Sequence, residues 1–262
     1  MDGRRHSVTS ADGTAIGLLT AGNGPPLLLV HGGMGQIESW QSLWDTLAAR
    51  WQVTAMDRRG RGTSGDTPPY DIAREFEDVA AVAASLAGGG PVDVFGHSFG
   101  ATCALGAAAN GAPMRRLALY EPPGPQTVPR DWRDRALAMV AAGRPGAAMM
   151  SFLTEGVGLS AARIEELRNA PRAYDVLAVV SATMPREAPA LADVDLKALA
   201  AGVQVPVLLI LGTDSPAWAK DITAELAAVL PQTTLAVLDG QGHDAADAAP
   251  AVLAGRLEEF FS

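Results

Sequence analysis

Short apolar runs alternate along this chain with longer stretches in which apolar residues recur every three or four positions. The run 27–30 is apolar throughout, which is typical of a strand buried on both faces of a sheet, and 92–95 is a second short, mainly apolar run. The predicted strands are 7–9, 14–21, 27–30, 52–56, 92–95, 116–120, 205–211 and 234–238, and the predicted helices between and after them are 39–50, 71–86, 101–109, 222–230 and 245–261. This alternation predicts an α/β fold, with a mostly parallel sheet covered by helices on both faces.

One long stretch, 122–202, breaks the alternation. It offers helical segments without a convincing strand, at 131–142, 146–153, 160–169, 172–183 and 193–200. We expect a helical cap here, inserted into a core formed by 1–121 and 203–262. An insertion after a central strand would lie over the carboxyl edge of the sheet, where binding sites are built. Four methionines of this cap are candidates to line an apolar pocket: Met139, Met149, Met150 and Met184.

The sequence Gly96-His97-Ser98-Phe99-Gly100 joins a predicted strand directly to a predicted helix. A Gly-x-Ser-x-Gly turn at such a junction is so tight that side chains two residues before and after the serine would clash. The turn exposes the serine hydroxyl at the sheet edge, and the N–H of Phe99, at the start of the helix, can face a developing oxyanion. The motif therefore predicts that Ser98 is a nucleophile in acyl chemistry.

A serine nucleophile needs a base, and the chain has four histidines. His6 lies in a polar N-terminal segment, His31 ends a strand, and the side chain of His97 should project away from Ser98. His243 follows the last strand in the glycine-rich sequence Gly240-Gln241-Gly242, which can carry an imidazole over the sheet edge. We therefore expect His243 to be the base.

An acidic residue must hold the base in the correct tautomer. Asp214 follows the predicted strand 205–211 and is the first choice. Glu121, which follows the strand 116–120, could reach the same place and is the alternative acid. Asp239 is a weaker option.

A second oxyanion donor should come from another strand end. The sequence His31-Gly32-Gly33-Met34-Gly35 follows the strand 27–30, and its glycines allow backbone N–H groups to approach a bound carbonyl closely. Gly33 is the first choice and Met34 the reserve. We expect His31 to brace this loop.

Composition and net charge indicate how many domains the chain forms and which classes of partner are disfavoured. The 262 residues, 48% hydrophobic and 19% charged, suit one globular domain, and the net charge of −9 argues against nucleic-acid and anionic-membrane partners. Without an apolar leader or a run long enough to span a bilayer, a cytoplasmic location is expected. The single cysteine, Cys103, lies in the small-residue helix after the elbow, and we expect it to be buried and to fill space in the core. Only Lys197 and Lys220 are lysines among the 20 basic residues, a bias typical of GC-rich bacterial genomes.

The order Ser98, Asp214, His243 resembles that of the α/β-hydrolase superfamily, and the resemblance covers nearly the whole chain outside the cap. The sequence 31–33 is similar to that family's oxyanion motif, 57–64 to its loop after the fourth strand, 96–100 to its elbow, and Gly242-His243 with Pro250 to its histidine loop. The resemblance implies an eight-stranded sheet with a helical cap after the sixth strand. Family members with dehalogenase or epoxide hydrolase activity carry an aspartate at the elbow, so a serine there disfavours both activities. In the family the 57–64 loop is mainly structural, although Arg58, Arg59 and Arg61 could recognise an anion.

These features predict a serine hydrolase, a monomer or homodimer, that cleaves a small or medium, largely apolar ester, thioester or lactone through an acyl enzyme. Metal or organic cofactors are not implied. Carbon–carbon bond hydrolysis and cofactor-free haloperoxidase or perhydrolase chemistry would reuse the same triad. The fold also resembles that of lyases, biosynthetic cyclases and hydrolase-like ligand receptors, which form an alternative class.

Overall fold

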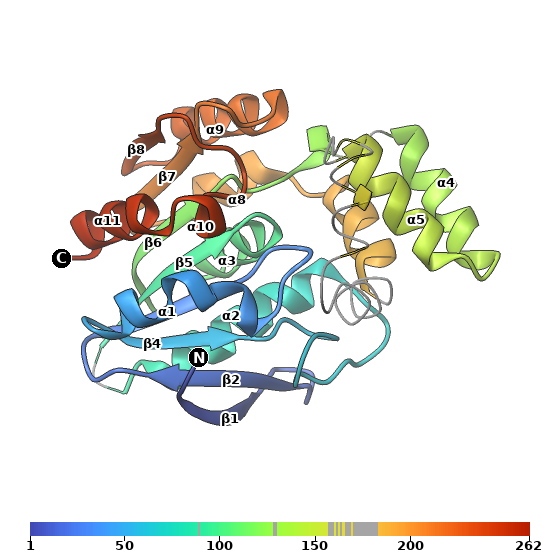
Figure 1. Ribbon diagram of the computed structural model, residues 1–262. Helices are drawn as coiled ribbons and strands as arrows, with labels where there is room; N and C mark the ends of the chain where they lie inside the picture. The colour runs from blue at the N-terminus through green and yellow to red at the C-terminus, as the bar shows by residue number, and fades with distance from the viewer. Residues whose placement is uncertain are drawn as a thin grey trace.

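The computed structural model of the protein describes residues 1–88, 90–127, 130–156, 160, 162, 164, 165, 169 and 183–262. Figure 1 shows a central twisted sheet with helices on both faces. The described helices include none that is both long enough and apolar enough to cross a membrane.

The sheet contains eight strands in the order β1-β2-β4-β3-β5-β6-β7-β8. β1 and β2 form an antiparallel hairpin at one edge, and β2 is also antiparallel to β4, whereas all remaining pairs are parallel. The strands are β1 (Arg4–Thr9), β2 (Ala15–Ala21), β3 (Pro26–Val30), β4 (Gln52–Met56), β5 (Val92–His97), β6 (Met114–Tyr120), β7 (Val207–Gly212) and β8 (Thr233–Leu238). This arrangement confirms the expected mostly parallel, eight-stranded α/β fold.

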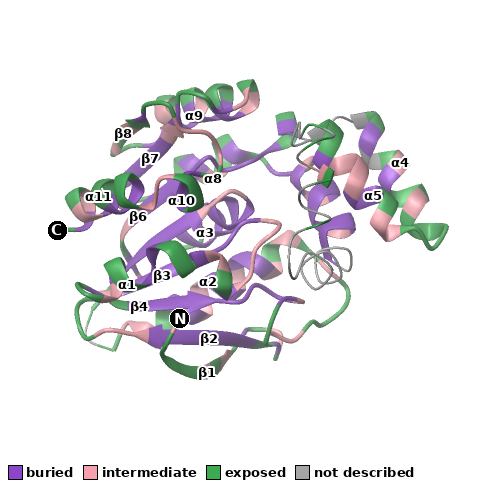
Figure 2. Ribbon diagram, viewed as in Figure 1, coloured by how far each residue is buried: buried purple, intermediate pink, exposed green. Residues whose placement is uncertain are grey.

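Two helical layers bury the two faces of the sheet. One layer contains α1 (Gln41–Ala48), α10 (Ala245–Ala248) and α11 (Pro250–Phe261), and the other contains α2 (Ile72–Leu86), α3 (Phe99–Ala109), α8 (Leu196–Gly202) and α9 (Ala217–Val229). Alternate strand residues point to opposite layers: Leu27 and Leu29 pack with the first, Leu28 and Val30 with the second. The central strands are therefore buried on both faces, as Figure 2 shows.

Local signals set the helix bounds. Asp71 caps α2 by accepting a hydrogen bond from the N–H of Ala73 (2.9 Å). The predicted helix 245–261 is two helices, because Pro250 has no N–H to continue the first one and begins α11. In α3, a side chain on Gly106 would meet the Phe76 ring at 2.5 Å, so glycine allows α2 and α3 to pack closely.

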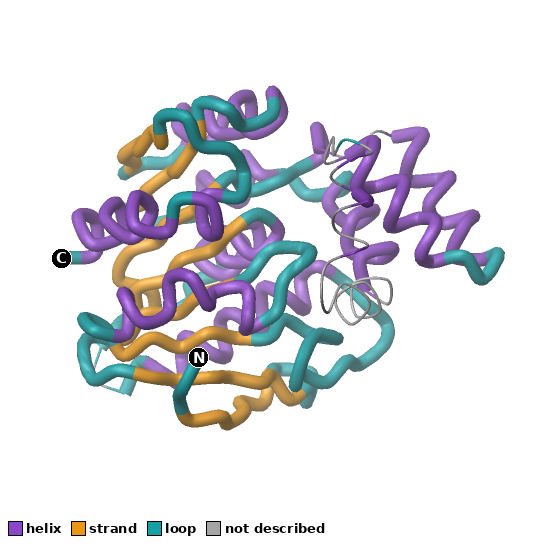
Figure 3. The backbone as a smooth tube through the Cα atoms, viewed as in Figure 1, coloured by secondary structure: helices purple, strands orange, loops and turns teal. Residues whose placement is uncertain are grey.

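The described part of the segment between β6 and β7 is helical and without strands, as Figure 3 shows. It contains a short 3-10 turn (Pro125–Thr127), α4 (Arg130–Ala141), α5 (Pro145–Ser151), a π-helical turn (Phe152–Gly156), helical residues 183–191, and α8. α4 and α5 lie beyond the sheet, whereas α8 packs against α3 and α9. The helices predicted at 160–169 and 172–183 lie largely outside the described residues.

Candidate active site

Ser98 lies in a strained turn between β5 and α3. Its backbone has φ 53° and ψ −128°, which residues with a side chain rarely adopt. A Cβ on Gly96 would meet the Ala101 Cα at 2.6 Å, and one on Gly100 would meet the carbonyl oxygen of Val30 at 2.3 Å. These distances confirm the steric reason for glycine on both sides of the serine.

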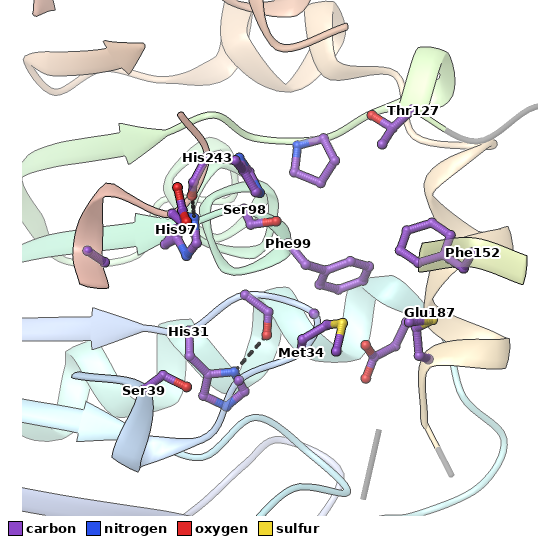
Figure 4. Close-up of a pocket in the computed structure, with 18 of the residues that line it drawn as sticks. His31, Met34, Ser39, His97, Ser98, Phe99, Thr127, Phe152, Glu187 and His243 are labelled. Atoms are coloured by element: carbon purple, nitrogen blue, oxygen red, sulfur yellow. Dashed lines mark hydrogen bonds between the residues drawn. The ribbon is translucent and has the colours of Figure 1, made fainter. Parts of the chain in front are cut away.

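Ser98 opens into a cavity of about 280 Å³ between the sheet edge and the helical segment. The cavity has a largely apolar wall, which includes Met34, Phe99, Phe152, Leu153, Met184 and Trp218. Figure 4 shows the His243 ring beside the Ser98 side chain, and Phe152 and Glu187 farther along the cavity. Of the four methionines that the sequence suggested for a pocket, Met184 is the one that lines it.

Two neighbouring side chains hold the loop that carries His243 by hydrogen bonds to its backbone. The Nε2–H of His97 donates to the carbonyl oxygen of His243 (2.9 Å), and the Tyr120 hydroxyl donates to the carbonyl oxygen of Gly242. The His97 ring lies 4.8 Å from the His243 ring between centroids. Burial, with a smaller effect from His243, lowers the pKa of His97 to about 3, so this imidazole stays neutral.

The acid that contacts His243 is Glu121. The Nδ1–H of His243 donates to Glu121 Oε2 (2.6 Å), while Glu121 Oε1 accepts from the N–H of Gly212 (2.9 Å) and the hydroxyl of Ser215. The Glu121 carboxylate is completely buried, and its backbone has a φ of 47°. Because Nδ1 faces Glu121, Nε2 is the ring nitrogen left to accept a proton from Ser98, which lies beside the ring.

The expectation that Asp214 orients His243 is wrong, because the side chain of Asp214 does not contact the histidine. Its exposed side chain accepts from the Thr213 hydroxyl (3.2 Å), and its own N–H donates to the carbonyl oxygen of Gln241 (2.9 Å). That backbone bond fixes the turn after β7 with the carboxylate toward solvent. Asp239 is also exposed.

Strand register explains why Glu121 is in reach. His97 and Tyr120 are register partners on β5 and β6, so Ser98 and Glu121 leave the sheet at the same level. The N–H of Ser98 donates to the carbonyl oxygen of Tyr120 (2.8 Å), which joins the two strand ends. The available signal in the sequence was the position of Glu121 directly after the strand next to the elbow strand.

The glycine loop after β3 lies directly against the elbow. A Cβ on Gly32 would be 3.0 Å from the Ser98 Cβ, and one on Gly33 would be 3.8 Å from the Phe99 Cβ. Phe99 is the first residue of α3, so its N–H has no acceptor within the helix. Gly33, Met34 and Phe99 all line the cavity beside Ser98.

His31 braces this loop, as expected. Its Nε2 accepts from the N–H of Arg58 (3.1 Å), so its Nδ1–H donates to the carbonyl oxygen of Gly32 (2.9 Å). Complete burial, aided by the nearby cations of Arg58 and Arg61, keeps the pKa of His31 well below its ordinary value. The imidazole is therefore a neutral structural link between two loops.

The three arginines of the next loop have buried side chains with carboxylate partners. Arg59 forms a bidentate salt bridge with Asp78 (both hydrogen bonds 2.7 Å), and Arg58 forms a bidentate salt bridge with Glu75 (2.7 and 3.0 Å). Arg61 contacts Glu187 (2.8 Å), a cavity-lining residue that the sequence analysis did not identify. Cys103 is a buried free thiol of α3.

Comparison with known proteins gives consistent matches. The model of the alpha/beta hydrolase family matches residues 27–256. A solved alpha/beta hydrolase from Sphaerobacter thermophilus is 38% identical, with a TM-score of 0.86 over 98% of this chain and 100% of that one. N-formylmaleamate deformylase from Pseudomonas putida is 29% identical over 232 residues, 85% of this chain and 83% of the relative. A 2-hydroxy-6-oxo-6-(2'-aminophenyl)hexa-2,4-dienoic acid hydrolase from Metapseudomonas resinovorans is 32% identical over 101 residues, 37% of this chain and 35% of the relative.

Proposed function

Because this chain is a hydrolase that belongs to the alpha/beta hydrolase family, we propose that it cleaves a small or medium, largely apolar ester, thioester or lactone through an acyl enzyme on Ser98. The observation that carries the proposal is the 2.6 Å hydrogen bond between His243 and Glu121 beside an elbow serine. The apolar cavity wall supports an apolar acyl group.

In the proposed reaction, the Ser98 hydroxyl attacks the substrate carbonyl while His243 Nε2 takes its proton. Glu121, in place of Asp214, keeps the ring in the tautomer with Nδ1–H and stabilises the imidazolium that forms. The N–H groups of Gly33 and Phe99, with Met34 as the reserve donor, hold the oxyanion. His243 then protonates the leaving group, and a water molecule, deprotonated by the same nitrogen, releases the acid and restores Ser98.

This proposal is tested with 4-nitrophenyl esters and thioesters of increasing acyl length. Release of 4-nitrophenolate or thiol by the wild type, with loss of about 10⁴-fold or more in Ser98→Ala, is the expected result. Equal turnover by the wild type and Ser98→Ala would contradict the proposal.

Carbon–carbon bond hydrolysis is the second candidate, and the 101-residue match to the dienoic acid hydrolase favours it. The same triad would serve: after Ser98 attacks the carbonyl, the carbon–carbon bond breaks and the carbanion or enolate that leaves takes the proton that His243 accepted from Ser98. β-Diketone-like substrates separate the two candidates, because a carbon–carbon hydrolase cleaves them while leaving simple esters largely intact. N-formylmaleamate belongs in the same screen, since the deformylase matches 85% of the chain.

A further inference from the structure

The cavity ends in a buried carboxylate, Glu187, that the proposed mechanism does not use. Resting on the proposed function, we infer that Glu187 determines specificity: the site accepts uncharged acyl groups and discriminates against acyl groups that end in a carboxylate. Glu187 lines the same cavity as Ser98, and Figure 4 shows it at the end away from the serine, near Met34.

Two arginines hold Glu187 in place. Its Oε1 lies 3.0 Å from Arg58 Nη2, and its Oε2 lies 2.8 Å from Arg61 Nη2. The side chain of Glu187 is 1% exposed, and those of both arginines are fully buried. A rotation of Glu187 away from the arginines would leave buried charges without partners, so the carboxylate stays where it is.

Arg58 has no free face for a ligand. Its guanidinium donates twice to Glu75 and once to the carbonyl oxygen of Gly32 (3.3 Å), in addition to its contact with Glu187. Arg61 donates to the carbonyl oxygen of Gly35 (3.3 Å) and to Glu187. Among these four charged residues, Glu187 alone lines the cavity.

The charges of this cluster balance, since two guanidinium groups face the two carboxylates of Glu75 and Glu187. Burial by itself would raise the pKa of Glu187, but Arg58 and Arg61 outweigh burial and lower it, so the residue is ionised at neutral pH. An acyl chain that extends from Ser98 along the apolar wall therefore meets a negative oxygen. A second carboxylate there would be repelled and stripped of water without a new cation to receive it.

The test compares two acyl groups that differ in one charge: 4-nitrophenyl hydrogen adipate, an anion, and its methyl ester, which is neutral. Release of 4-nitrophenolate reports cleavage of the same bond in both. For the wild type we expect kcat/KM to be at least about tenfold higher for the neutral ester. A preference of the wild type for the anion would overturn the inference.

Two variants should move this preference in opposite directions. Glu187→Gln leaves Arg61 without its anionic partner and should raise the anion-to-neutral ratio of kcat/KM by about tenfold, whereas Arg61→Gln should lower the ratio further. Glu187→Gln/Arg61→Gln should return the ratio toward that of the wild type. The ratio is read from folded protein, and Arg61→Gln alone decides the question if Glu187→Gln does not fold.

Asp247→Asn is the matched control, because this exposed carboxylate also lines the cavity but is not paired with either arginine. It removes the same charge and should leave the ratio within about twofold. A ratio that does not change in Glu187→Gln or Arg61→Gln, or that changes equally in Asp247→Asn, would overturn the inference.

Failure of the proposed function gives a different result. If the wild type cleaves neither ester, binding of methyl hydrogen adipate and dimethyl adipate to Ser98→Ala is measured by ligand-observed NMR. Tighter binding of the dimethyl ester, reversed in Ser98→Ala/Glu187→Gln, supports the role of Glu187 without any turnover. Tighter binding of the anion to Ser98→Ala contradicts it.

Discussion

His243 and Glu121 share a 2.6 Å hydrogen bond although they lie 122 residues apart in the chain. The carboxylate reaches the histidine from the end of β6, the strand next to that of Ser98, rather than from the end of β7. Its other oxygen is fixed by the N–H of Gly212 and by Ser215, so the β7 loop orients the acid without supplying it.

This arrangement predicts the effects of two single substitutions. Glu121→Gln removes the negative charge, and because Gly212 and Ser215 donate to one side-chain oxygen, the amide NH2 is left to face His243 Nδ1, where it favours the wrong tautomer. The value of kcat should therefore fall by about 10³- to 10⁴-fold. Asp214→Asn is the control, because the exposed Asp214 side chain does not contact His243, and it should retain activity within about twofold. Steady-state kinetics on an ester that the wild type cleaves measure both variants. A larger loss of kcat in Asp214→Asn than in Glu121→Gln would mean that Asp214 is the acid.

A second prediction concerns the buried ion pair of Arg59 with Asp78. Asp78→Asn leaves a fully buried guanidinium without one of its carboxylates and should lower the free energy of unfolding by about 3 kcal/mol. Glu77→Gln, one residue earlier on α2, breaks the exposed pair with Arg74 and should cost less than about 1 kcal/mol. Urea denaturation measures both. Equal losses would mean that burial does not set the strength of these pairs.

Two glycines of the helices predict opposite changes in stability. Gly106→Ala places a methyl group 2.5 Å from the Phe76 ring and should destabilise the protein by about 1–3 kcal/mol. Gly255→Ala in α11 meets no atom within 4 Å and should stabilise it by about 0.5–1 kcal/mol through helix propensity. Thermal unfolding of the two variants, side by side, gives the signs, and a stabilised Gly106→Ala would contradict the packing described for α2 and α3.

The low pKa of His97, about 3, predicts a loss of stability in acid. The unfolded chain, with a histidine pKa of about 6.5, binds more protons than the folded protein between the two values, so this contribution to stability is complete above pH 6.5 and declines toward pH 3. Between these two pKa values, His97 lowers the free energy of unfolding by up to about 1.4 kcal/mol for each unit that the pH falls. Urea denaturation of the wild type and His97→Asn between pH 7.5 and pH 5 gives the free energy of unfolding at each pH. This free energy should change less steeply with pH in the variant, and parallel plots for the two proteins would contradict the prediction.

Local features were predictable from the sequence because their causes are local. Gly96 is required by the turn itself, since its Cβ would meet the backbone of Ala101. Gly100 also belongs to the motif, although the backbone that excludes a side chain there is that of Val30 on the neighbouring strand β3. The alternation of strands and helices likewise follows from which faces must be buried. Pro250, in contrast, was visible in the sequence as a helix breaker and still lay within a single predicted helix.

The choice of acid depends on geometry that the sequence pattern does not encode. Glu121 and Asp214 both follow a strand, and what separates them is a left-handed φ of 47° at Glu121 and the bond of Asp214 to Gln241. Glu187 was missed for a related reason. Its partner Arg61 is 126 residues away, so neither residue carries a periodic or local signal of the pair.

The most direct test of the account is the intact mass of the folded protein after incubation with a small fluorophosphonate, with Ser98→Ala and Glu121→Gln alongside the wild type. We predict one adduct on the wild type, none on Ser98→Ala, and labelling at least about 100-fold slower on Glu121→Gln. An adduct on Ser98→Ala, or no adduct on the folded wild type, would contradict the assignment of Ser98 as a nucleophile activated by His243 and Glu121.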